Sequence, residues 1–173
     1  MKDKPHEFLK VSNSGTVPCL QLKDKIIDES IDIMIWALRK NDPEGWLDMP
    51  AEGYRLIDEV EQKFKPNLDK TKYATRYPQD DSKVSKNLAI EYLINLDKKI
   101  NGEFFFGEQP KLADIAIFPF VRQFANIDIK WFNEFGWEKL QNWLKVFVES
   151  KMFDKSQKKF VQWRPNANPI FFP

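Results

Sequence analysis

The spacing of apolar residues changes early in this chain, and that change restricts the possible folds more than any other feature. Thr16–Leu22 alternates β-favouring residues with others, and Ile26–Ile27 follows a tight turn at Asp24–Lys25. From Glu29 onwards, apolar residues recur at intervals of three and four, which is the period of one helix face. The sequence therefore predicts a single β-hairpin followed by helices over most of the chain.

One helix is expected after the hairpin, and then a bundle of four or five helices. The second helix after the hairpin is expected to close before Pro66, because proline disrupts a helix interior. Ser82 is expected to cap a long helix that runs through Lys99. The stretch Leu112–Val121 is apolar except for Asp114, so that helix should be buried nearly all round. The residues that mark the other apolar stripes are Ile31, Met34, Ile35, Leu38, Ile57, Val60, Phe64, Ala89, Leu93, Leu96, Ile100, Leu140, Leu144, Phe147 and Val148.

Composition excludes several classes of function. The net charge is +1, so no basic surface argues for a nucleic-acid partner. His6 is the only histidine and Cys19 the only cysteine, which excludes a His-based triad, an internal disulfide and a thiolate zinc cluster. No apolar run reaches the roughly 20 residues that a membrane helix needs. We therefore expect a cytoplasmic protein that has no membrane or nucleic-acid partner and no metal.

Three motifs occur in the order in which glutathione transferases carry them. The first comprises Gly15–Leu20 and Ile26–Ser30 with the helix after it, the second is Asn41–Leu47, and the third is Pro110–Ala125. Together they cover nearly the whole chain, which thus resembles the glutathione transferase family. The resemblance implies a mostly α fold, in which a helical C-terminal bundle follows a partial thioredoxin-like β-β-α remnant.

The resemblance also implies boundaries and a missing part. Residues 1–40 are expected to form the partial thioredoxin-like domain, 41–50 the linker and 51–173 the all-helical domain. The stretch KDKPHEFL matches the segment just after the family's opening strand-helix-strand unit, where the family keeps its catalytic Tyr, Ser or Cys. We therefore expect no catalytic residue in this chain. Met1 is open to four interpretations, namely an internal methionine, a shortened reading frame, a processed product and a true start.

Val17 and Pro18 form the first candidate site. In the resembled family the matching proline is cis, and the residue before it offers its backbone to the cysteinyl part of glutathione. The alternative is an ordinary trans proline that ends an edge strand.

Glu29 and Ser30 form the second candidate site, at the start of a helix. Free N–H groups and the helix dipole there suit a carboxylate, and a serine hydroxyl can add a hydrogen bond. The family holds the γ-glutamyl carboxylate with this acidic-Ser pair. The alternative is ordinary capping of the helix by Asp28 or Ser30.

Asp114 and Pro119 are expected to have structural roles. With Lys111 as N-cap, Asp114 stands at N3, where a carboxylate can bond back to a free N–H. The family has Ser or Thr at the cap, so Lys111 removes half of the capping box and should weaken the helix start by about 1 kcal/mol. Pro119 should bend the same helix. Cys19 is expected to be a small, inert, buried residue.

The family resemblance makes glutathione the expected co-substrate and an unknown hydrophobic electrophile or thiol the expected partner. It places the second-substrate site between the domains, although no residue of that site can be assigned. Lys4 and His6 lie near where the glycine carboxylate of glutathione could approach, or are solvated surface groups. A lone hairpin edge invites pairing with another chain, so we expect a homodimer. Three functions remain open: a glutathione-dependent transferase or thiol reductase, a non-catalytic binding module, and an unrelated helical bundle.

Overall fold

The computed structural model describes residues 4–171. The chain divides into two compact units. Among the described residues, the N-terminal unit combines 4–42 with 157–171, and the helical unit comprises 43–156. In this division the C-terminal tail belongs to the N-terminal unit, and the domain boundaries expected from the sequence stay a prediction. Phe160 and Trp163 of the tail line a cavity together with residues near the N-terminus.

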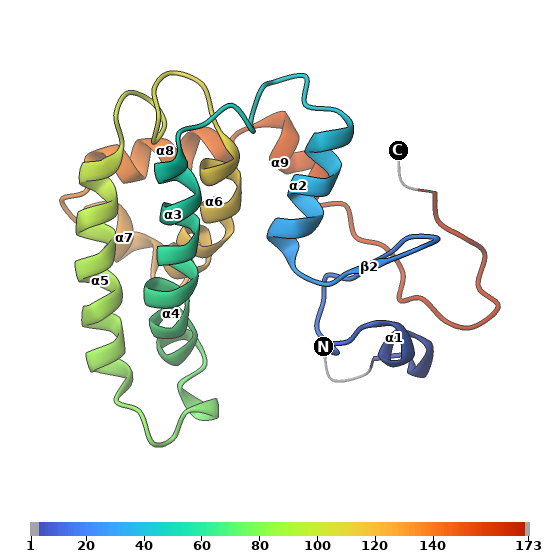
Figure 1. The fold of residues 1–173 in the computed structure, drawn as a ribbon. Coiled ribbons are helices and arrows are strands. Elements are labelled where there is room, and N and C mark those ends of the chain that lie inside the picture. The colour runs from blue at the N-terminus through green and yellow to red at the C-terminus, as the bar shows by residue number, and fades with distance from the viewer. Residues whose placement is uncertain (1–3, 172–173) are drawn as a thin grey trace. The chain divides into compact units, whose positions relative to one another are not determined.

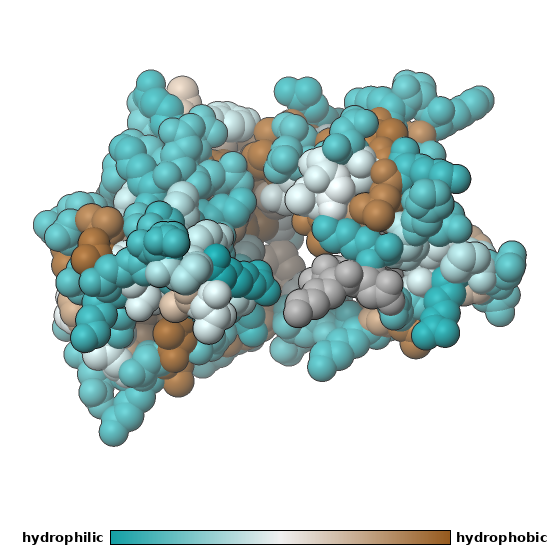
Figure 2. All heavy atoms as spheres, turned by 90° about the horizontal axis from the view of Figure 1, so that it is seen from below, coloured by the Kyte–Doolittle hydropathy of each residue, from teal (hydrophilic) through white to brown (hydrophobic). Residues whose placement is uncertain are grey.

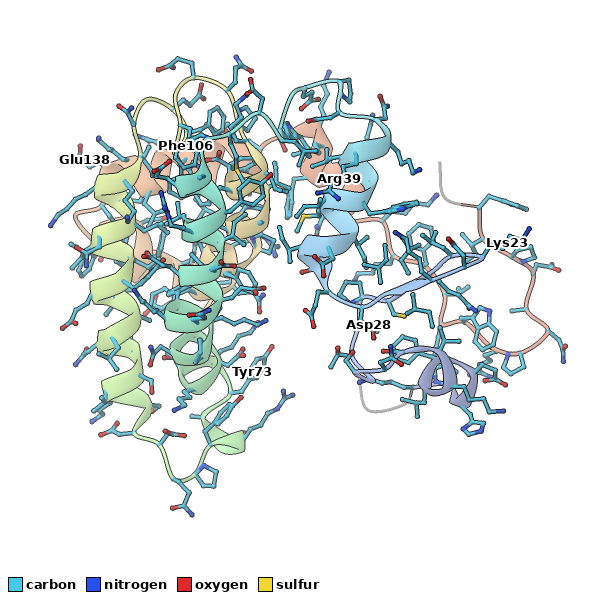
Figure 3. The ribbon with its side chains drawn as sticks, in the orientation of Figure 1. Lys23, Asp28, Arg39, Tyr73, Phe106 and Glu138 are labelled. Atoms are coloured by element: carbon cyan, nitrogen blue, oxygen red, sulfur yellow. The ribbon has the colours of Figure 1, made fainter. Side chains whose placement is uncertain are left out.

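The N-terminal unit holds the short helix α1 (His6–Val11), the strands β1 (Leu20–Gln21) and β2 (Ile26–Ile27), and the helix α2 (Ser30–Lys40) (Figure 1). The strands pair antiparallel, with Leu20 opposite Ile27 and Gln21 opposite Ile26. The amide of Leu22 donates to the carbonyl of Lys25 over 2.8 Å and closes the turn, at whose tip Figure 3 shows Lys23. The predicted hairpin is therefore present.

The first strand is much shorter than the predicted Thr16–Leu22. Pro18 has no amide hydrogen for a ladder bond, and the amide of Thr16 donates instead to Oγ of Ser14 over 3.2 Å. Local side-chain bonds thus compete with strand pairing in this stretch.

The helical unit begins with α3 (Ala51–Glu59), a π-helical turn (Val60–Phe64) and α4 (Lys65–Lys72), which follow one another without interruption (Figure 1). The predicted end before Pro66 is therefore wrong. In the π-helical turn the amide of Lys65 donates to the carbonyl of Val60, five residues back. This wider turn allows the helix to accommodate a proline, which has no amide hydrogen and whose ring would crowd a regular helix interior.

A 3-10 turn (Ala74–Arg76) leads to α5 (Ser82–Lys99), whose apolar stripe matches the prediction. Its cap, however, is Asp81, whose Oδ1 accepts from the amides of Lys83 and Val84. Ser82 is the first helical residue instead of the cap, because the carboxylate before it reaches both amides.

The remaining helices are α6 (Leu112–Ala125), α7 (Ile129–Glu134), α8 (Glu138–Val148) and α9 (Lys151–Ser156). Helix α6 continues four residues past the predicted end at Val121, and Pro119 lies inside it. None of the helices in the described part of the chain has the length and apolar character needed to cross a bilayer.

The core of the helical unit is aromatic. Trp137 and Trp143 are each 1% exposed, and Phe64 stacks on Tyr92 with ring centroids 5.6 Å apart. Among the described residues, all the buried hydrophobic side chains lie between Leu56 and Phe147. On the face drawn in Figure 2, hydrophobic patches are separated by hydrophilic residues.

Candidate functional site

The peptide bond between Val17 and Pro18 is cis. The bond geometry expected from the family resemblance is thus confirmed, and the trans alternative is not found. Val17 is 48% exposed, and it lies in the segment that leads from α1 to β1.

Asp28 holds the loop before Val17 against the start of α2. Its Oδ2 accepts from the amide of Asn13 over 2.9 Å and from the amide of Ser14 over 3.3 Å. Figure 3 shows Asp28 where β2 ends and α2 begins. One carboxylate therefore connects the hairpin, the loop of residues 12–16 and the helix start.

The same carboxylate controls the chemistry of Cys19. Hydrogen bonding to Asp28 is the largest cause that raises the pKa of the Cys19 thiol, followed by burial and by the Asp28 charge. The contact also makes the largest contribution to the lowered pKa of Asp28. Because only the thiolate is strongly nucleophilic, the raised pKa works against a reactive Cys19.

Helix α2 begins without a side-chain cap. Glu29 is the N-cap residue, and its side chain makes no capping hydrogen bond. The alternative of ordinary capping by Asp28 or Ser30 is not found, because Asp28 bonds to the loop instead. Amides in the first turn of α2 therefore lack a side-chain acceptor, and they lie beside the Ser30 hydroxyl and the exposed Glu29 carboxylate. This arrangement suits the carboxylate and the ammonium of an α-amino acid.

A cavity of about 880 Å³ lies in the N-terminal unit. Val17, Cys19 and Lys4 line it, whereas Glu29, Ser30 and His6 do not. The Nζ of Lys4 donates to the carbonyl of Gly15. The structure thus brings Val17 and Lys4 to one cavity and leaves the acidic-Ser pair outside its lining.

Asp114 is fully buried in the helical unit and accepts three hydrogen bonds. They come from the amide of Lys111 (2.9 Å), the amide of Phe105 (3.1 Å) and Nε1 of Trp143 (2.9 Å). Burial raises the pKa of Asp114, and these hydrogen bonds oppose that rise. The bond from Lys111 is the one expected of a carboxylate at N3.

The other half of the capping box is absent, because the ammonium of Lys111 cannot accept a hydrogen bond. Instead, its Nζ donates to the carbonyl of Gly45 over 3.0 Å. The geometry gives Asp114 the role of connecting a loop, a helix start and a neighbouring helix, with no access to solvent.

The sequence interpretation missed two groups of residues at the site. Asp28 was considered only as a helix cap, although a carboxylate directly after a strand is also placed to bind a neighbouring loop. Phe160 and Trp163 were given no role by the sequence interpretation, and no sequence signal indicated that they would line a cavity beside Val17.

Comparison with known proteins identifies the fold. Residues 57–145 match the model of the glutathione S-transferase C-terminal domain. Glutathione S-transferase L3 of Arabidopsis thaliana is 33% identical over 126 residues, which cover 68% of this chain and 49% of the relative. For glutathione S-transferase DHAR3 of the same plant the identity is 26%, over 69% of this chain and 43% of the relative. The chain spans about half the length of these curated relatives.

Solved structures agree on the fold. A glutathione S-transferase of class Gtt2 from Vibrio parahaemolyticus aligns with a TM-score of 0.71 at 19% identity, over 90% of this chain and 79% of that one. A glutathione transferase homologue from Sulfitobacter, solved with bound glutathione, aligns with a TM-score of 0.70 at 12% identity, over 88% and 78%. The fold is thus a helical C-terminal domain with a partial thioredoxin-like remnant, and the chain belongs to the glutathione S-transferase family.

Proposed function

We propose that this chain binds glutathione through its N-terminal unit. The observation that carries the proposal is the start of α2, where uncapped first-turn amides lie beside Ser30 and Glu29. The γ-glutamyl end of glutathione is an α-amino acid head group. Its carboxylate would accept from the amides and from the Ser30 hydroxyl, and its ammonium would pair with Glu29.

Val17 would bind the middle of the tripeptide. Within residues 4–171 no hydrogen bond occupies its backbone amide or carbonyl, and the residue is half exposed. An extended peptide can bond to such groups as a strand does. This part of the proposal is supported by the family resemblance at Val17 and Pro18.

We propose further that the chain by itself conjugates glutathione weakly or not at all. In the family the thiolate is stabilised from the opening unit, and the motifs matched in this chain belong to the segments that follow that unit. Cys19 does not replace that unit as a thiol catalyst, because Asp28 and burial raise the pKa of its thiol. The alternative function is a non-catalytic binding or scaffold module of the same fold.

Calorimetric titration with glutathione tests the binding proposal. Ser30→Ala and Glu29→Gln are each expected to weaken binding by about tenfold, since each removes a charge-assisted hydrogen bond of about 1.5 kcal/mol. Asp24→Asn, at the exposed hairpin turn of the same unit, is the matched control and should bind as the wild type does. Equal affinity in all four proteins, or no binding at millimolar glutathione, would contradict the proposal.

Turnover of a chlorinated nitrobenzene with glutathione tests the catalytic part. The wild-type rate is expected to equal the rate without protein. A clear excess over that background would show that the chain is an active transferase, and Cys19→Ser would then show whether its thiol takes part.

We also propose a homodimer and residence in the cytoplasm. An isolated two-stranded hairpin is only marginally stable in water, and its edges carry unpaired backbone groups. The described residues form one such two-stranded sheet. Sedimentation equilibrium should give a dimer mass, and a monomer at all concentrations would exclude this assembly.

A further inference from the structure

The sequence contains one asparagine-glycine pair, Asn101–Gly102. The pair follows Ile100, the C-cap of α5, in the loop that leads to α6, where Figure 3 shows Phe106. Both residues are exposed. Asparagine is a chemically labile residue, because the backbone nitrogen of the next residue can attack its side-chain amide. Glycine hinders that approach least, since it has no side chain and the widest choice of backbone conformation.

The attacking nitrogen of this pair is free. Within the described residues, neither the backbone amide of Gly102 nor the side chain of Asn101 makes a hydrogen bond. Gly102 has a φ of 106°, and a Cβ added there would lie 2.9 Å from the carbonyl oxygen of Gly107. The fold therefore requires glycine at position 102 and leaves its amide available to Asn101.

Two other asparagines precede a small residue, and their surroundings differ. In Asn13–Ser14 the second amide donates to Oδ2 of Asp28 over 3.3 Å. In Asn166–Ala167 it donates to the carbonyl of Arg164 over 3.0 Å. Such an amide must lose a hydrogen bond before it can attack. Of the three pairs, the one at Asn101 is thus the most favourable for the reaction.

We propose that Asn101 is a site of spontaneous deamidation. The backbone nitrogen of Gly102 forms a bond to Cγ of Asn101 and loses its proton to water. The side-chain nitrogen takes up a proton and leaves as ammonia. Water then adds to the cyclic imide and opens it at either carbonyl, which gives aspartate or isoaspartate at position 101. The net reaction consumes one water molecule and releases one ammonia.

The product alters a loop that is connected to the core of the helical unit. The amide of Phe105 donates to Oδ1 of Asp114 over 3.1 Å, and the rings of Phe104 and Phe147 lie 5.6 Å apart. Isoaspartate routes the main chain through its side-chain carbon and so adds one backbone atom before Phe104. Because the buried partners are closely packed, this insertion displaces the amide and the ring from them. A new carboxylate just after α5 also opposes the helix dipole. We therefore expect the modified protein to be less stable.

Peptide mapping by mass spectrometry tests the site, with the full chain incubated at mildly alkaline pH, folded and in urea. Asn101 should react at similar rates in both states, because the fold leaves its attacking amide free. Asn13 and Asn166 should each react about tenfold more slowly in the folded chain than in urea, since a hydrogen bond holds the attacking amide. A folded rate at Asn101 that is reduced as much as the rate at Asn13 would overturn the proposal.

Urea denaturation of aged protein tests the consequence. The midpoint of the wild type should fall as isoaspartate accumulates. The midpoint of Asn101→Gln should stay constant with time, because the longer side chain is less well placed for ring closure. This variant should fold, since Asn101 is exposed and its side chain has no hydrogen bond within the described residues.

Freshly prepared Asn101→Asp introduces the charge without the additional backbone atom, so its midpoint should fall less than that of the aged wild type. An equal decline in aged Asn101→Gln would overturn the assignment of the effect to this residue. A wild-type midpoint that stays constant while isoaspartate accumulates would overturn the link between the loop and the core, and the modification site would stand.

Discussion

The two units of this chain are held together by different kinds of interaction. The helical unit contains all the buried hydrophobic side chains among the described residues, and its single fully buried carboxylate is saturated with hydrogen bonds. In the described part of the N-terminal unit every hydrophobic residue keeps some exposure, and Asp28 and loop hydrogen bonds hold its elements. The helical unit is thus densely packed, whereas the looser N-terminal unit contains a cavity lined by Val17 and Cys19.

The largest effect is expected from Asp114→Ala in the helical unit. It leaves two buried donors and the part-buried amide of Lys111 without an acceptor, and each unsatisfied group costs about 1–3 kcal/mol, so the free energy of unfolding should fall by about 3 kcal/mol or more. Urea denaturation measures the loss. Asp81→Ala, which removes an exposed cap of α5, should lower stability by about 1 kcal/mol. Equal losses of unfolding free energy in the two variants would show that the buried hydrogen bonds of Asp114 contribute no more to stability than the exposed cap of α5.

A comparison of two leucines sharpens the contrast in packing. Leu93 on α5 is 0% exposed, so Leu93→Ala should destabilise by about 2–5 kcal/mol through a cavity that the core cannot close. Leu38 on α2 is only partly buried, and Leu38→Ala should lower stability by about 1 kcal/mol. Both are measured by urea denaturation with a probe in each unit. A loss at Leu38 as large as that at Leu93 would contradict the loose packing of the N-terminal unit.

The two aspartates should respond to pH in opposite directions. The pKa of Asp114 is raised above 3.8, so its contribution to stability is greatest below pH 3.8 and declines as pH rises through the folded pKa. The pKa of Asp28 is lowered, so its contribution is complete above pH 3.8 and is lost as pH falls through the folded pKa.

Unfolding free energies of Asp114→Asn and Asp28→Asn across acidic pH measure this. The amount by which the unfolding free energy of Asp114→Asn lies below that of the wild type should decrease as pH rises above 3.8. The deficit of Asp28→Asn should grow as pH rises towards 3.8 and then stay constant. If the stability differences of both variants from the wild type changed with pH in the same direction, the predicted contrast between Asp114 and Asp28 would be wrong.

The smallest effect is expected at the start of α6. Lys111→Ser restores an acceptor at the N-cap, a gain of about 1 kcal/mol. It also removes the hydrogen bond from Lys111 to Gly45, so the net stabilisation should be about 0.5 kcal/mol. Thermal unfolding resolves this as a small rise in Tm, and Lys111→Ala, which gains no cap, should lower it. A Tm of Lys111→Ser below that of Lys111→Ala would show that no cap forms.

Local patterns predicted the elements well where one face of the helix is buried. The stripes of α5 and α8 match residues found in the core, such as Ala89, Leu93, Leu140 and Leu144, except that Val148 at the end of α8 is 39% exposed. The wrong predictions concern the helix end before Pro66 and the cap at Ser82. The helix passes Pro66 because a π-helical turn precedes it, and Asp81 caps α5 because its carboxylate reaches two amides.

The candidate site was only partly predictable. The bond between Val17 and Pro18 and the helix start at Ser30 are properties of short motifs, so sequence resemblance could indicate them. The contact of Asp28 with the loop and with Cys19 joins residues 9 to 15 positions apart, and no spacing rule encodes it. The roles of Val17, Glu29 and Ser30 in binding stay predictions until ligand titrations are made.

The sequence by itself determined the family, the order of hairpin and helices, and the position of Asp114 at N3 of a buried helix, because each depends on residues close together in the chain. Only the tertiary structure decided that Trp143, 29 residues away, completes the hydrogen bonds of Asp114. It alone also decided that Trp163 lines a cavity with Val17. Such pairings depend on which faces of distant elements meet, and the periodicity of a segment carries no information about its partner.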